Sequence, residues 1–155
     1  MKKIASLLLV LVLALSVTAC GGGGSTKEAD LTKVMSDMKV KITNTDMMDL
    51  AKEDLTTNYD IAADDIKQFA AYVDTTGIKA DEIVLVEAVD GEAAKRIKDC
   101  LDTRYQQKEV ENKDYLPEQY AIIEKCNVTM DGNYVSMIVS PDAETLTEIY
   151  NSAIK

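Results

Sequence analysis

Hydrophobic residues recur along the chain with two spacings, one typical of helices and one of strands. Apolar residues three and four positions apart predict helices over residues 30–42, 91–108 and 140–153. Asp30 and Ser140-Pro141 are typical residues at the start of the first and last of these helices. Asn44-Thr45-Asp46 ends the first helix, and a second, short helix is expected near residues 49–58.

Strands are predicted where apolar residues alternate with polar ones or form a β-branched run. The predicted strands cover residues 66–73, 82–89, 126–130 and 134–139. For residues 66–73 a helix beginning at Ala63 is a second interpretation. Asp131-Gly132-Asn133 predicts a tight hairpin turn, because such turns need residues that tolerate positive φ. The polar residues 109–125 predict a long loop that holds a short helix.

The order of the elements, helices first and then ββαββα, predicts an α+β fold. An antiparallel sheet with helices packed on one face would satisfy this order. The chain has 155 residues, which suits one domain of ordinary size. We therefore expect a single α+β domain over residues 30–155.

A short apolar run precedes this domain. Lys2 and Lys3 open the chain, and residues 4–17 are apolar apart from Ser6 and Ser16. At about 1.5 Å per residue, a helix of this length cannot cross a hydrocarbon core of about 30 Å. A basic start followed by a short apolar run is typical of a secretory signal peptide. Residues 1–19 are therefore predicted to be a signal peptide.

The end of this run, Val17-Thr18-Ala19-Cys20, resembles the bacterial lipobox, with valine in place of the commoner leucine. The resemblance implies cleavage between Ala19 and Cys20 and thioether lipidation of Cys20. Two acyl chains give stable anchoring in a membrane. Residues 20–29 would then be the lipidated cysteine and a glycine-rich tether with a reach of about 15–18 Å. The expected location is the outer face of a bacterial cell membrane, with the lipid on Cys20 inserted in it.

Composition and charge exclude several functions. Asp and Glu number 27 against 17 Lys and Arg, which gives a formal net charge of -10. Nucleic-acid binding depends on clustered positive charge, so no nucleic-acid partner is expected. The chain has no histidine, which excludes Ser-His-Asp and Cys-His catalysis and His-ligated metal sites. We expect no catalytic residues, no metal site and no cofactor.

Two cysteines remain after Cys20. Cys100 lies on the apolar stripe of its predicted helix, and Cys126 shares a predicted strand face with apolar residues. An extracytoplasmic location permits oxidation, so the two are a candidate disulfide. The alternative is two buried thiols that behave as small hydrophobic residues.

A candidate recognition loop contains two tyrosines and a proline in a polar segment. Its residues are Tyr115, Leu116, Pro117 and Tyr120. Aromatic residues are enriched at binding interfaces. The alternative is that these side chains anchor the loop to the core.

Five short motifs of the chain resemble a family of small lipoproteins from Gram-positive bacteria, classed only as a domain of unknown function. The motifs are Tyr59-Asp60-Ile61, Asp64-Asp65-Ile66, Ala80-Asp81-Glu82-Ile83, Tyr115-Leu116-Pro117 and Gly132-Asn133-Tyr134-Val135. The resemblance covers roughly residues 47–154. It implies a fold and a location and supplies no catalytic residue.

These observations favour a non-enzymatic, lipid-anchored binding or accessory module of the cell envelope. Its partner would be another envelope protein or a small ligand. The alternative is a hydrolase or transferase that acts on envelope material with carboxylates alone. That alternative expects a cleft with two facing carboxyl groups, at least one of them with a raised pKa.

Overall fold

A computed structural model of the chain describes residues 26–155. The predicted signal peptide and the predicted lipidation site, Cys20, lie outside the described residues. In chain order the elements are α1 (Leu31–Lys39), β1 (Met47–Asp49), α2 (Lys52–Asn58), the short 3-10 helix η1 (Ala63–Asp65), β2 (Ile66–Asp74), β3 (Glu82–Ala88), α3 (Gly91–Lys113), α4 (Pro117–Ile123), β4 (Val128–Asp131), β5 (Tyr134–Val139) and α5 (Ala143–Ile154).

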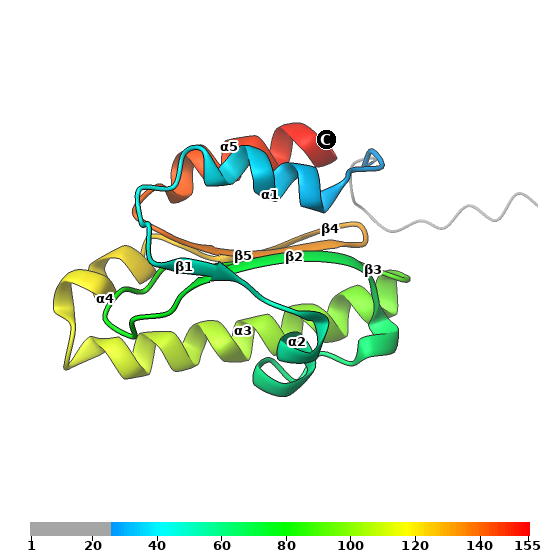
Figure 1. The fold of residues 1–155 in the computed structure, drawn as a ribbon. Helices are drawn as coiled ribbons and strands as arrows, with labels where there is room; N and C mark the ends of the chain where they lie inside the picture. The colour runs from blue at the N-terminus through cyan, green and yellow to red at the C-terminus, as the bar shows by residue number, and fades with distance from the viewer. Residues whose placement is uncertain (1–25) are drawn as a thin grey trace, which may run out of the picture.

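The fold is α+β with an antiparallel sheet, as predicted. The five strands lie in the order β1-β2-β3-β5-β4, and every neighbouring pair is antiparallel. Figure 1 shows α1 and α5 on one face of this sheet and α2, α3 and α4 on the other. Helices therefore cover both faces, and the prediction of helices on one face is corrected.

Strand β3 explains why both faces need a cover. Every residue of β3 is buried. Ile83 and Leu85 pack in the core beneath α1 and α5, whereas Val84 and Val86 pack in the core against α3. Successive side chains of a strand point to opposite faces, so an unbroken apolar run presents apolar surface on both sides of the sheet. A single helical layer would leave one of these surfaces in water.

Residues 109–125, between the third predicted helix and the third predicted strand, are largely helical. Helix α3 continues to Lys113 and α4 follows from Pro117, where a long loop with a short helix is predicted. The last turns of α3 are mostly polar in sequence, so they show no apolar stripe that would indicate a helix. Even Val110 is 74% exposed and packs against no core. Proline at the first position of α4 suits a helix start, because that N–H has no helical partner.

One strand is missing from the prediction. Residues 47–49 form β1, which pairs with β2, and the second helix begins only at Lys52. Three residues are too few for alternation to show in a sequence. The strand preferred for residues 66–73 is confirmed as β2, and the strand of residues 134–139 is confirmed as β5.

The first described residues lie at one end of the sheet. The Lys27 N–H donates to the Ile154 carbonyl at the end of α5, at 2.8 Å. The side chain of Thr26 packs against Gly132 in the β4–β5 turn. The N-terminal end of the domain therefore meets the C-terminal end of the chain. Among residues 26–155, no helix has both the length and the apolar character that crossing a bilayer requires.

The predicted hairpin turn is confirmed, and Gly132 in it has φ +57°. A Cβ at this position would lie 3.2 Å from the Thr26 hydroxyl oxygen. We expect Gly132→Ala to lower the free energy of unfolding by about 1–2 kcal/mol, because a left-handed backbone disfavours a side chain. Urea denaturation measures the change.

Gly91→Ala is the matched control, because a Cβ at Gly91 meets nothing within 4 Å and its φ is ordinary. We expect this variant to be unchanged or slightly more stable than the parent. Equal losses for the two variants would contradict the role of the turn.

Candidate functional site: a groove between α5 and the start of β4

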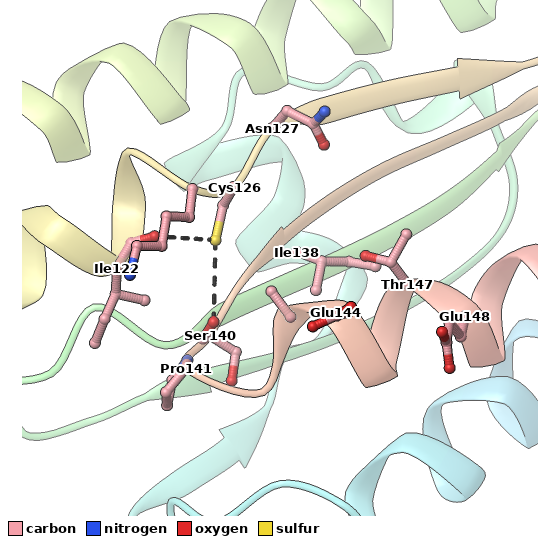
Figure 2. A pocket seen from close by; sticks show the side chains of 11 residues that line it. Ile122, Cys126, Asn127, Ile138, Ser140, Pro141, Glu144, Thr147 and Glu148 are labelled. Atoms are coloured by element: carbon pink, nitrogen blue, oxygen red, sulfur yellow. Dashed lines mark hydrogen bonds between the residues drawn. The ribbon is translucent and has the colours of Figure 1, made fainter.

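A groove of about 650 Å³ lies between α5 and the segment that joins α4 to β4. Figure 2 shows Ile122 and Cys126 on one side of it and Glu144, Thr147 and Glu148 of α5 on the other. Its volume falls within the range of about 300–1,000 Å³ that is usual for ligand sites. The groove is therefore a candidate for a binding site, with an apolar floor and charged groups on its walls.

The register of two strands creates the opening. Strand β4 begins at Val128, which pairs with Met137 of β5. Strand β5 continues to Val139, so its last two residues extend beyond the start of β4. Ile138 consequently forms part of the apolar floor of the groove, and α5 follows the corner at Ser140 and Pro141.

The two walls of the groove carry opposite charges. Lys125 lines the side of α4, and Glu144 and Glu148 line the side of α5. The two glutamates are exposed and lie one helical turn apart on the same helix. Within residues 26–155 neither carboxylate has a cation at ion-pair distance. The wall formed by α5 is thus an unpaired acidic surface above an apolar floor.

Cys126 lies at the edge of this groove as a protonated thiol. Its thiol donates to the Ile122 carbonyl at 3.3 Å and lies 4.0 Å from the Ser140 carbonyl (Figure 2). Burial raises the pKa of the thiol above its ordinary value. A protonated thiol is a poor nucleophile, so the arrangement suits a structural cysteine.

The candidate disulfide does not form in the structure. Cys100 and Cys126 are both free. The Cys100 thiol donates to the Asp60 carbonyl at 3.5 Å, beside the end of α2, while Cys126 contacts the end of α4. Burial is the main reason that the pKa of Cys100 is also raised. The structure thus agrees with the alternative, two partly buried thiols that pack against the core.

The candidate recognition loop leads into α4. Tyr115 is 84% exposed, and Pro117 is exposed as well. Leu116 and Tyr120 are half-buried, and the neighbouring Gln119 accepts a hydrogen bond from the Ala80 N–H at 2.8 Å. One side of this segment is therefore anchored to the loop before β3, and Tyr115 remains free for contact.

The acidic pair Asp81-Glu82 is divided between the two faces of the sheet. Asp81 is buried and accepts a hydrogen bond from the Ser140 hydroxyl at 3.1 Å, and burial raises the pKa of its carboxyl. Glu82 points to the α3 face, where its two oxygens bind Arg104 at 2.9 Å each and one of them binds Lys108 at 2.8 Å. The adjacent carboxyl groups do not face each other.

In the Glu82 cluster one buried carboxylate is shared by two cations, Arg104 and Lys108. Burial alone would raise the pKa of Glu82, but Arg104 and Lys108 hold that pKa below its ordinary value. The Arg104 guanidinium also lies 5.9 Å from the centre of the Tyr59 ring. Within residues 26–155, no three acidic or cysteine side chains are arranged to hold a metal ion. The cluster ties α3 and the end of α2 to β3.

The groove residues of α5 are absent from the sequence-based list of candidate sites. Glu144 and Glu148 give one signal in the sequence, two like charges four positions apart in a predicted helix. Exposed helices commonly carry such charges, so the signal does not separate a site from a solvated surface. The strand register that exposes Ile138 cannot be seen in the sequence.

A model of a protein family, a domain of unknown function named DUF4358, matches residues 40–140. The match runs from the end of α1 through β5 and includes the whole sheet. The chain belongs to this family, and the resemblance to a domain of unknown function is confirmed. No curated protein and no solved structure matches the chain.

Proposed function

We propose that the chain is a lipid-anchored, non-enzymatic binding module on the outer face of a bacterial cell membrane. The groove beside β4 is its ligand site, and this groove is the observation that carries the proposal. Its apolar floor and few charged groups are typical of sites that bind and orient a ligand. The anchor rests on the lipobox of residues 17–20.

The position of the groove supports this function. The tether, predicted over residues 20–29, would join the domain already at Thr26, because Lys27 and Ala29 pack with the domain beside the end of α5 and the β4–β5 turn. The groove is built from the beginning of α5 and the residues before β4, toward the opposite end of both elements. Glu144 and Ile154 are about 15 Å apart along a helix that rises 1.5 Å per residue. A ligand could enter the groove without meeting the attachment point.

Photo-crosslinking in intact cells tests both parts of the proposal. A photoreactive residue at Thr147 reports on the groove, and an alkyne fatty acid in the growth medium reports on the anchor. We expect Thr147 to capture one reproducible envelope component and the parent chain to carry the fatty acid. Cys20→Ala is expected to lose the fatty acid and to leave the membrane fraction, whereas Cys126→Ala keeps both.

The matched control for the groove is a photoreactive residue at Glu53, an exposed position on α2, on the other face of the sheet. Capture of the same species from both positions would contradict a groove site. Capture from a photoreactive residue at Tyr115, without capture from Thr147, would place the binding surface at the start of α4 instead. Fatty-acid labelling of Cys20→Ala would contradict the anchor.

A further inference from the structure

Strand β4 leaves one of its edges unpaired within the described part of the chain. It is the last strand in the sheet order, and among residues 26–155 it pairs with β5 alone. The backbone N–H and C=O groups on the outer side of an edge strand can accept another strand. The outer side of β4 therefore offers main-chain hydrogen bonds to an extended peptide.

Helix α5 packs over β5, the strand next to this edge, and the groove separates α5 from Asn127 just before β4. Val128 packs in the core against α3, so its neighbours Asn127 and Thr129 face the α5 side. Thr129 exchanges a hydrogen bond with Ser136 of β5, at 2.8 Å between the two hydroxyl oxygens. A strand added to β4 would likewise direct every second side chain toward α5 and the groove.

The acidic wall that α5 forms, opposite Lys125, selects the kind of side chain. Glu144 and Glu148 are like charges at positions i and i+4, an arrangement that disfavours the helix unless a cation lies between them. A lysine or arginine side chain would supply that cation. Its aliphatic stem could cover Ile138 while its charged end reaches the carboxylates.

We propose that the groove binds an extended peptide that pairs with the outer edge of β4 and places a lysine or arginine against Glu144 and Glu148. The inference rests on the proposed function and names the class of ligand. Main-chain pairing would give affinity, and the acidic wall would give the preference for a basic residue.

Fluorescence anisotropy with defined peptides tests this inference on the full chain in detergent micelles. The probe is a labelled six-residue peptide, blocked at both ends, in which valine and lysine alternate. A peptide with glutamate in place of lysine is expected to bind at least tenfold more weakly. The variants Glu144→Gln and Glu148→Gln should each weaken binding of the lysine peptide about fivefold.

Glu53→Gln is the control for the overall negative charge of the chain. Glu53 is an exposed glutamate in the first turn of α2, as Glu144 is in α5. We expect Glu53→Gln to bind the lysine peptide like the parent. A loss of affinity equal to that of Glu144→Gln would show that the peptide binds by non-specific attraction to the negative charge of the chain. That result would overturn the inference.

N-methylation of the peptide backbone tests the pairing with β4. Alternate amides of an extended peptide point to opposite edges, so methylation of the valine amides and of the lysine amides blocks different edges. We expect the two methylated peptides to differ at least tenfold in affinity. Equal affinities would overturn strand addition.

The result at Thr147 separates this inference from the proposed function. Failure of all peptides, together with specific capture from Thr147 in cells, would mean that the groove binds another class of ligand. The inference would then fall and the proposed function would stand. If no peptide binds and Thr147 captures nothing specific in cells, both the inference and the proposed function of the groove are overturned. Urea midpoints equal to that of the parent would show that the glutamine variants are folded.

Discussion

Replacing Glu82 by glutamine is expected to lower the free energy of unfolding by about 3–5 kcal/mol. The carboxylate is buried and is the shared partner of Arg104 and Lys108, of which Lys108 is also buried. Removing the negative charge would leave two cations against each other in a region of low polarity. Urea denaturation at neutral pH measures the loss.

Glu92→Gln is the matched control for this substitution. Glu92 pairs with Lys95 on the same helix, but both side chains are largely exposed. Exposed ion pairs contribute little, so the control is expected to lose a small fraction of the free energy that Glu82→Gln loses. Similar losses for the two variants would contradict a structural role of the buried cluster.

The pH dependence of stability gives a second readout of the same cluster. The folded chain holds the pKa of Glu82 below its ordinary value of 4.5. The contribution of this group is therefore present above pH 4.5 and is lost as the pH falls toward the lower pKa of the folded state. We expect the stability of the parent to fall more steeply on acidification than that of Glu82→Gln. If the free energy of unfolding of the parent and of Glu82→Gln falls with pH along parallel curves, the lowered pKa of Glu82 is contradicted.

Alanine at either of two adjacent positions in β3 should destabilise the protein strongly. Leu85 and Val86 are both fully buried, one beneath α1 and α5 and the other against α3. We expect the free energy of unfolding to fall by about 2–5 kcal/mol for Leu85→Ala and by about 1.5–3 kcal/mol for Val86→Ala. Thermal or urea unfolding measures both.

Met130→Ala on the edge strand β4 is the control, because Met130 is 39% exposed. Its expected loss is much smaller than that of either β3 variant. A sheet with only one covered face would tolerate one of the two β3 substitutions. A loss at Leu85 without a loss at Val86, or the reverse, would therefore contradict the two-layer arrangement.

The sequence predicts local elements well where one side of an element faces water. The stripe of α5 and the turn at Gly132 are examples, since their signals come from neighbouring residues. The second helical layer is missed although residues 83–86 form an unbroken apolar run, because such a run does not say which helices cover it. β1 is missed because three residues show no period.

The site is less visible in the sequence than the fold. Tyr115 stands out as an aromatic residue in a polar segment, and the structure leaves it exposed. The groove depends instead on where β4 begins relative to β5 and on how α5 crosses them. These are relations between distant segments, so Ile138 and Glu148 carry no sequence signal that joins them.

The hydrogen bond between Lys27 and Ile154 has a practical consequence for engineering the chain. Because the two ends of the described domain meet, a short linker could join them in a circular permutant. New termini could open at Gly77, in the β2–β3 loop, where a Cβ would meet nothing within 4 Å. A reporter fused after Lys155 would project beside the first residues of the domain and leave the groove unobstructed.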